Sequence, residues 1–413
     1  MALFGVGLMG GIPAFLAQAA ASEKITSPYK RRKVLVCIFQ RGAMDGLMAV
    51  TPFTDTFLQA ARPNLFMSAA NSGKEAKLTD LDGRFGLHPA MSAFVPLYRN
   101  KQLAIVHGIG SPNNTRSHFD AQDYMESGTP FNKGTSSGWL NRAVGLLGHD
   151  ALTPFTAVSL TSAMPRSFYG DNPAVAISNL QDFAIRMKGD PAGTSTASKS
   201  FEELYDKTSP GLLKETGKES FEAMKLLQQA DTQNYRPANN VIYPNSILGN
   251  SMKQIAQLIK MDVGLEVAFA ESTGWDTHFN QGTENGVFAR SAADMSNSIV
   301  AFWNDLAAWQ DDVTVMTMTE FGRTVHQNGT GGTDHGRASC NFIIGSQVAG
   351  GQVHGNIQPL AIENLEDGRD LAVTTDFRSV FSEVADTHLG IGNDPVLFPG
   401  WSGRKAGVMR PKG

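Results

Sequence analysis

The sequence has few cysteines, no surplus of basic residues and, beyond its first segment, no long apolar run. Two cysteines among 413 residues exclude a disulfide framework, so Cys37 and Cys340 are expected to be packed thiols. Lys and Arg number 35 against 39 Asp and Glu, for a formal net charge of −4, which argues against nucleic acid as a partner. Because no later stretch approaches about 18 uninterrupted apolar residues, we expect no stable membrane span in the mature chain.

The first 22 residues differ from the rest. Residues 1–21 carry no charge and are rich in Ala, Gly, Leu and Phe, and Ala17-Gln18-Ala19 has the small-residue pattern of a cleavage site. This composition is typical of an export signal, although the first lysine is Lys24 and the expected basic start is missing. We interpret residues 1–22 as a truncated leader, with an apolar tail as the alternative.

The remaining chain alternates buried-type apolar runs with amphipathic segments. This alternation predicts an α/β fold, a three-layer α/β/α sandwich from about residue 30 to 405 around a mostly parallel sheet. Its strands are expected at 33–39, 102–107, 265–269, 313–319 and 341–344, with helices at 119–128, 289–309 and 376–389. The polar, helical stretch 179–262 is expected to be a peripheral insertion.

Residues that can bind a metal follow the predicted strands. They are Asp45, Asp276, His278, Glu320, Asp334 and His335. Parallel strands place their carboxyl ends at one edge of a sheet, so these side chains are expected to converge there. Carboxylate and imidazole groups favour a divalent cation, with zinc the first choice and calcium, magnesium or manganese as alternatives. Taken singly, each could instead cap a turn or a helix, as Asp45 could at its position.

The segment 116–118 lies between a strand and a helix. Ser117 is therefore expected near a helix N-terminus, where it could be a nucleophile toward an anionic ester or simply an N-cap. His118 lies beside it. Arg116 or Arg323 could hold the equatorial oxygens of a phosphate or sulfate ester. The sequence thus predicts a small anionic ester as substrate and leaves the oligomeric state open.

Five motifs resemble those of the bacterial family called domain of unknown function 1501. They are Arg41-Gly-Ala-Met-Asp-Gly46, Arg116-Ser-His-Phe-Asp-Ala-Gln122, Gly274-Trp-Asp-Thr-His278, Glu320-Phe-Gly-Arg-Thr324 and Gly332-Thr-Asp-His-Gly336. The resemblance runs from about Arg32 to Leu389. It implies a fold like that of the alkaline phosphatase and sulfatase superfamily, and a twin-arginine leader that directs the protein to the periplasm or outside the cell.

The resemblance also implies roles for single residues. Asp45 matches the superfamily's aspartate after the first strand, and Ser117 is the best match to its nucleophile. The superfamily's first metal takes an Asp and a His four residues apart, whereas Asp276 and His278 are two apart. Glu320 stands where the second metal's Asp would be, with His335 as the late histidine ligand. These departures put a two-metal stoichiometry in question.

Three functions are compatible with these residues. The first is an exported metal-dependent hydrolase of phosphate or sulfate esters. The second is a non-catalytic secreted binding or assembly protein that keeps the fold and a metal. The third, a phosphomutase, suits a cytosolic metabolite and fits export poorly. A formylglycine sulfatase is disfavoured, because Cys37 is followed by Ile38, Phe39 and Gln40 instead of the Cys-x-Pro-x-Arg signature.

Overall fold

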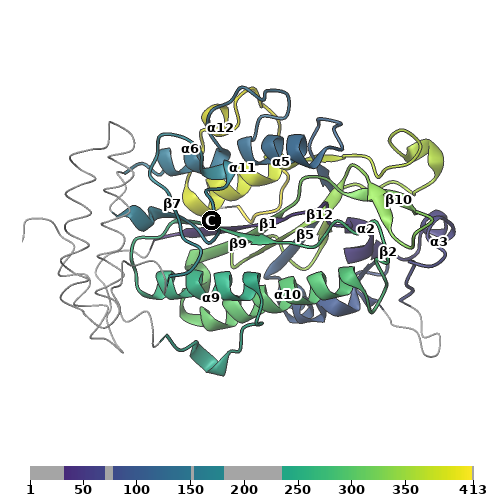
Figure 1. The fold of residues 1–413 in the computed structure, drawn as a ribbon, viewed down its shortest axis with the longest axis horizontal. Coiled ribbons are helices and arrows are strands. Elements are labelled where there is room, and N and C mark those ends of the chain that lie inside the picture. The colour runs from purple at the N-terminus through teal and green to yellow at the C-terminus, as the bar shows by residue number, and fades with distance from the viewer. Residues whose placement is uncertain (1–31, 70–77, 150–152, 181–234, 412–413) are drawn as a thin grey trace, which may run out of the picture.

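A computed structural model describes residues 32–69, 78–149, 153–180 and 235–411. The predicted leader at 1–22 lies outside the described residues, as does most of the predicted insertion. The described chain has three layers, a central sheet with helices on both faces, as predicted (Figure 1). Among the described residues, no helix combines the length and the apolar character that crossing a membrane requires.

The central sheet is mostly parallel. In spatial order it contains β13 (Val353–His354), β5 (Leu103–Gly110), β12 (Ser339–Gly345), β9 (Val313–Met318), β1 (Val34–Gln40), β8 (Val267–Ser272), β6 (Ala157–Ser159) and β7 (Val175–Ala176), and β14 (Thr375–Asp376) pairs with β5. Only β12 among the described strands of this sheet runs antiparallel to its neighbours. All five predicted strands are present, with ends that differ by at most three residues.

β1 is buried on both of its faces, which explains why its sequence is a continuous apolar run. Its residues 34, 36 and 38 pack into the core beneath one helical layer, and residues 35, 37 and 39 pack into the core beneath the other. Successive side chains of a strand point to opposite faces, so a strand covered on both sides needs apolar residues throughout.

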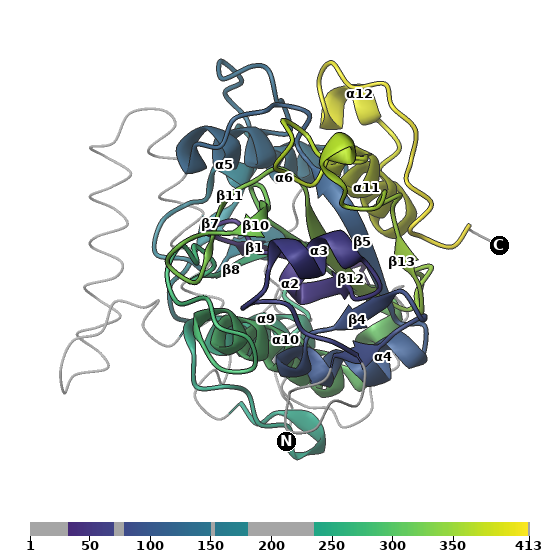
Figure 2. The ribbon, with the colours of Figure 1, turned by 90° about the vertical axis from the view of Figure 1, so that its right-hand side faces the viewer.

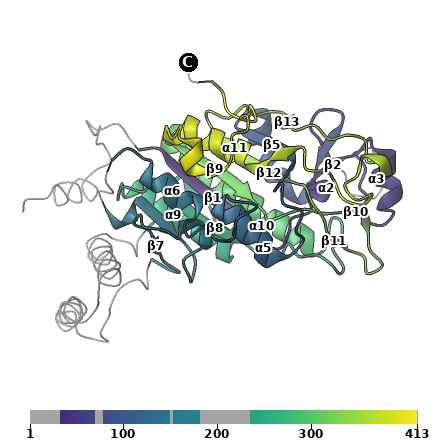
Figure 3. The same ribbon diagram turned by 90° about the horizontal axis from the view of Figure 1, so that it is seen from above.

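One helical layer contains α9 (Ile247–Lys260), α10 (Val287–Asp305), η1 (Pro89–Phe94) and α4 (Val95–Arg99). The other contains α5 (His118–Ser127), α6 (Trp139–Gly145), α11 (Phe377–Val384), its π-helical extension η7 (Ala385–Leu389) and α12 (Asp394–Leu397). Figure 3, which views the second layer from above, shows α5 beside the hairpin of β10 (Arg323–Gln327) and β11 (Thr333–His335).

The predicted helix 289–309 corresponds to α10 followed by the 3₁₀ turn η5 (Ala307–Asp312). Its predicted apolar side is buried, with Met295, Ile299 and Phe302 fully inaccessible. The unit β8–α10–β9 is a crossover connection that places two parallel strands on either side of β1, in agreement with the predicted mostly parallel sheet. The end of the predicted insertion is α9, which packs against the sheet as part of this layer.

Smaller elements gather at one end of the sheet. They are α2 (Gly46–Ala49), α3 (Thr56–Ala61), the three-stranded sheet β2 (Val50–Pro52), β4 (Phe85–Leu87) and β3 (Thr79–Asp80), and the β10–β11 hairpin. Figure 2 looks onto this end. The 3₁₀ turns η2 (Pro154–Thr156), η3 (Arg166–Phe168), η4 (Ala238–Asn240) and η6 (Ile362–Asn364) complete the described elements. The carboxyl ends of β1, β5, β8 and β9 all point to this end, because these strands share one direction.

Candidate metal centre

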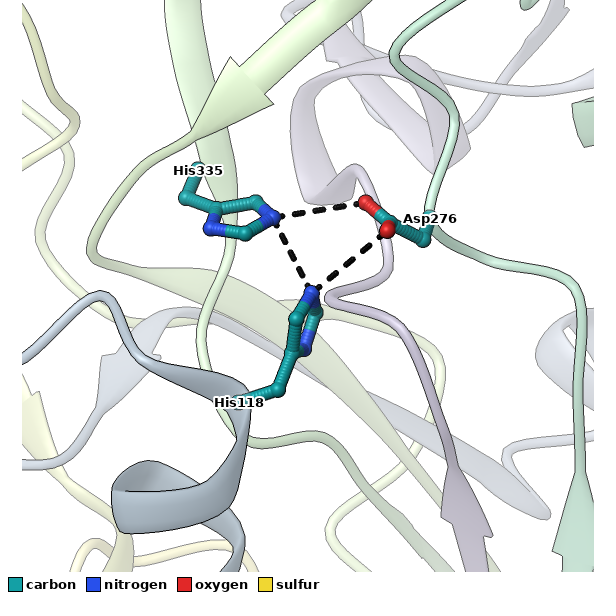
Figure 4. A group of neighbouring side chains, drawn as sticks. All are labelled: His118, Asp276 and His335. Atoms are coloured by element: carbon teal, nitrogen blue, oxygen red, sulfur yellow. Dashed lines mark hydrogen bonds and ion pairs between the residues drawn. The ribbon is translucent and has the colours of Figure 1, made fainter.

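Three side chains from distant parts of the chain meet at this edge of the sheet. His118 is the first residue of α5, Asp276 lies in the loop after β8, and His335 ends β11 (Figure 4). One ligand atom from each lies within 4.8 Å of the other two. The Nε2 atom of His335 is 3.0 Å from the Nε2 atom of His118 and 3.4 Å from Oδ1 of Asp276.

His278 extends the group to four. Its Nε2 atom lies 2.9 Å from that of His335 and 3.1 Å from Oδ1 of Asp276. The Nε2 atom of His118 is 3.6 Å from the other oxygen of Asp276. Ligands around a tetrahedral zinc at about 2.0–2.2 Å are separated by roughly 3.3 Å, so the spacings among His118, Asp276 and His335, and those of His278 to Asp276 and His335, are compatible with shared binding of one cation. We call His118, Asp276, His278 and His335 the four-residue cluster.

The second nitrogen of each imidazole is already occupied. Nδ1 of His118 lies 2.8 Å from Oε1 of Glu320, Nδ1 of His278 lies 2.9 Å from Oδ1 of Asp334, and Nδ1 of His335 lies 2.9 Å from the Arg116 carbonyl oxygen. Carboxylate and carbonyl oxygens accept hydrogen bonds, so Nδ1 carries the proton and a neutral ring turns its Nε2 lone pair to the cluster. Metal-binding histidines commonly have such partners. The donor set therefore fits a divalent cation.

Glu320 lies behind His118, outside the four-residue cluster. Its side chain is fully buried, and Oε1 accepts hydrogen bonds from Gly42 N and Gln122 Nε2 as well as from His118. Burial by itself would raise the pKa of Glu320, but these hydrogen bonds lower it below its usual value. The bond to Glu320 in turn raises the pKa of His118. Glu320, predicted as a metal ligand, thus supports the ring of His118 from outside the four-residue cluster.

Arg323 supports Asp276 in the same way. Its Nη1 atom donates to Oδ1 of Asp276 at 2.8 Å, and the guanidinium is buried beneath the half-exposed carboxylate. Burial would raise the pKa of Asp276, but the hydrogen bond and charge of Arg323 lower it. Asp334, hydrogen-bonded to Asn328 and His278, has a lowered pKa as well. Asp276 is therefore held ionised and in a fixed orientation.

The structure places Asp45 away from the four-residue cluster. It is the N-cap of α2, accepts a hydrogen bond from Met48 N, and forms a buried ion pair with Arg62. Asp45 is therefore a helix cap, the alternative that its position in the sequence also allowed.

Ser117 and Arg116 are also at the site's periphery. Ser117 is exposed at the N-cap position of α5, and its hydroxyl makes no capping hydrogen bond. The guanidinium of Arg116 is directed to Asp367 and Asp370, so only the carbonyl oxygen of this residue contacts the cluster. Arg116 and Arg323, the two arginines predicted to hold the ester oxygens, thus both form ion pairs with carboxylates.

Apolar side chains form the floor of the cluster. The ring of Phe321 lies 5.0 Å from the rings of both His118 and His335, and it packs with Ala43 and Ala121. The open side is partly exposed to solvent, since the three histidine side chains of the cluster are between 25% and 31% accessible. An apolar surface that excludes water strengthens the electrostatic interactions of the charged groups next to it.

The sequence places His118 among the predicted catalytic residues, and the structure groups it with three of the predicted metal-binding residues. The position of His118 indicates this grouping, because His118 follows β5 at the same sheet edge as the other residues of the cluster. Gln122, Gln281 and Arg62 are not identified from the sequence. No motif marks Arg62, whose partners Asp45, Thr324 and Val325 are determined by tertiary packing.

The solved proteins to which the chain is similar in structure include the following three. The C-terminal periplasmic domain of EcEptC from Escherichia coli, in complex with Zn, has 7% sequence identity and a TM-score of 0.37, over 77% of this chain and 73% of that one. Alkaline phosphatase from the Antarctic bacterium TAB5 has 11% identity and a TM-score of 0.33, over 77% and 92%. PsFucS1 sulfatase from Pseudoalteromonas sp. has 11% identity and a TM-score of 0.33, over 93% and 74%.

No curated protein gives a sequence match to the chain. A family model does match, over residues 32–397, which is nearly all of the chain after the leader-like segment. The chain belongs to the family described as protein of unknown function (DUF1501).

Proposed function

We propose that this protein is an exported metal-dependent hydrolase of phosphate or sulfate esters, with a zinc-type cation held by His118, Asp276, His278 and His335. One observation carries the proposal: three imidazoles with occupied Nδ1 atoms turn their Nε2 atoms toward one another and toward one carboxylate. Facing lone pairs repel one another unless a cation lies between them. A three-histidine, one-carboxylate donor set suits zinc.

A bound zinc ion supplies Lewis acidity at the ester oxygen. The protein's residues orient the reactants around it. Glu320 fixes the tautomer of His118, and Arg323 fixes Asp276. Ser117, next to His118, presents an exposed hydroxyl at the start of α5, where unpaired backbone N–H groups and the helix dipole favour an anion. We assign Ser117 the role of nucleophile.

Recognition of the substrate's organic part falls to aromatic residues. Phe119 and Phe279 are 89% and 68% exposed, and each directly follows a histidine of the cluster. Arg116 and Arg323 are already paired with carboxylates, so neither is free to recognise the ester. We propose that the substrate is a small anionic ester with an aryl or alkyl group that contacts these two rings.

Export is the second part of the proposal. The uncharged, Ala- and Gly-rich segment 1–22 with its Ala17-Gln18-Ala19 pattern supports an export leader, and so a periplasmic or secreted location. The twin-arginine type of this leader rests on the family resemblance alone, because the segment contains no arginine pair. Expression of the full gene in a bacterial host, followed by fractionation, tests this part. Retention of the protein in the cytoplasm would contradict it.

Two measurements on purified protein test the catalytic part. The first is metal content by mass spectrometry, for the wild type and for His335→Ala. The second is turnover of an aryl phosphate, a phosphate diester and an aryl sulfate with zinc, magnesium, manganese or calcium added. We expect bound metal and turnover in the wild type and neither in His335→Ala. The control is His326→Ala, which removes an exposed histidine of the same hairpin and should retain both properties.

The outcomes separate the competing functions. Bound metal without turnover of any ester would favour the non-catalytic binding or assembly protein. A wild-type protein that binds no divalent cation would overturn the proposed centre.

A further inference from the structure

A continuous chain of buried hydrogen bonds leads from Arg62 to the four-residue cluster. Arg62 follows α3, and its guanidinium grips Asp45 through two bonds, Nη1 to Oδ2 at 2.8 Å and Nη2 to Oδ1 at 3.2 Å. The same guanidinium donates to the carbonyl oxygens of Thr324 at 2.7 Å and Val325 at 2.8 Å, both in β10. Arg62 thereby ties Asp45 to the hairpin that carries His335.

The carboxylate of Asp45 has no acceptor capacity left for a metal. Besides Arg62, it accepts from Met48 N at 3.1 Å and from Gln281 Nε2 at 2.7 Å. An ionised carboxylate offers about four lone-pair sites, and four donors fill them here. The buried positive charge of Arg62 also disfavours a cation at this position. Arg62 therefore stands where a second metal would need to bind Asp45.

The chain continues from Gln281 to Asp276. Oε1 of Gln281 accepts from the hydroxyl of Thr333 at 2.7 Å, and that hydroxyl lies 3.3 Å from Nε of Arg323. Nη1 of Arg323 donates to Oδ1 of Asp276 at 2.8 Å. Asp45, Gln281, Thr333 and Arg323 are each at most 1% exposed, so water does not compete for these bonds.

We propose that Asp45, locked by Arg62, is a positioning residue that fixes Asp276 through Gln281, Thr333 and Arg323, and that the centre binds a single cation. This inference rests on the proposed metal centre and goes beyond it, because it assigns stoichiometry and the role of Asp45. The fixed network keeps the Asp276 carboxylate turned to the three histidines. Partners of this kind typically change metal affinity by roughly 10- to 100-fold.

The first test compares zinc stoichiometry and zinc affinity, measured by competition with a chromogenic chelator, in the wild type and in Asp45→Asn. We expect one zinc per chain in both, with affinity reduced roughly 10- to 100-fold in the variant. Asp305→Asn is the matched control. Asp305 is another buried carboxylate, at the C-terminal end of α10, where it contacts Lys260, Tyr235 and Tyr243. It makes no contact with the network described above, so its loss should leave zinc affinity unchanged.

A second variant covers the case in which Asp45→Asn fails to fold. Thr333→Val removes the hydroxyl that joins Gln281 to Arg323 but leaves the Asp45–Arg62 pair intact. We expect weakened zinc binding in Thr333→Val and its recovery in Thr333→Ser, which restores the hydroxyl. Recovery by serine would not follow from a general packing role of the side chain.

Three results would overturn the inference. Two zinc ions in the wild type, with one lost in Asp45→Asn, would make Asp45 a ligand. Zinc affinity unchanged in both Asp45→Asn and Thr333→Val would remove the positioning role while leaving the proposed centre intact. A wild type that binds no zinc would instead remove the centre itself.

Discussion

His118 and His335 face each other through their Nε2 atoms, 3.0 Å apart, although they are 217 residues apart in the sequence. The hydrogen bond to Glu320 raises the pKa of His118, whereas burial and the charge of His118 lower the pKa of His335. The two rings cannot both be protonated at this distance without strong repulsion. A shared cation removes that conflict, because it satisfies both lone pairs at once.

The first prediction concerns Glu320. In Glu320→Gln the negative charge behind His118 is lost, so we expect zinc affinity to fall roughly 10- to 100-fold. Asp334→Asn is the comparison, because Asp334 supports His278 but its side chain is 55% exposed and therefore screened by solvent. Chelator competition measures both. A larger loss of zinc affinity in Asp334→Asn than in Glu320→Gln would contradict the prediction that the buried carboxylate has the larger effect.

The second prediction concerns the turn after β1. Gly42 has a φ of +116°, and a Cβ atom there would lie 2.5 Å from the backbone nitrogen of Asp276. Gly42→Ala should lower the free energy of unfolding by roughly 1–3 kcal/mol and also weaken zinc binding, because it pushes on Asp276. Gly148→Ala is the control, since Gly148 also has positive φ but open space around it. Denaturant unfolding and chelator competition on both variants check this, and equal effects on zinc binding would contradict it.

The third prediction concerns acid stability. Burial lowers the pKa of His88, His107 and His388 to about 4 in each case. Between their ordinary pKa of 6.5 and about 4, the unfolded chain binds protons that the folded chain does not. The free energy of unfolding should therefore fall as pH decreases through this window, by up to about 1.4 kcal/mol per pH unit for each histidine.

Denaturant unfolding at several pH values between 7.5 and 4.5 measures this slope. His388→Gln should be less stable at pH 7.5, because His388 bonds to the Val34 carbonyl oxygen at 2.9 Å and to the Thr314 hydroxyl at 3.0 Å. It should also have a shallower pH slope than the wild type. An identical slope in wild type and variant would show that His388 does not titrate as described.

The central strands and the shared edge were predictable because burial on both faces leaves a distinct apolar signature. The apolar sequences of β1, β5, β8 and β9 predict these strands directly. Their common direction is the one expected when helices connect strands of one sheet by crossovers. This common direction brings the loops after these strands together. His278 and His335 could be expected near each other on this basis alone.

The individual partners could not be predicted in the same way. Asp45 follows β1 as a ligand should, yet its carboxylate is captured by Arg62, which lies 17 residues further on and is buried only in the folded chain. Glu320 follows β9, but it reaches the backbone of Gly42 and the ring of His118. Sequence position identifies the edge of the sheet, whereas side-chain packing decides which residues form the four-residue cluster and which ones support it.

The last prediction concerns Phe119 and Phe279. If these rings contact the organic part of the ester, Phe119→Ala and Phe279→Ala should each lower kcat/KM for an aryl phosphate by about fivefold, from roughly 1 kcal/mol of lost apolar contact. Turnover of methyl phosphate should change little, because a methyl group is too small to cover either ring. Zinc content should be unchanged, since neither side chain supplies a ligand atom. Ile242→Ala, which removes an apolar side chain that is also 89% exposed, is the matched control and should alter neither substrate. An equal loss for aryl and methyl phosphates in the phenylalanine variants would show that the rings act on the cluster instead of on the substrate.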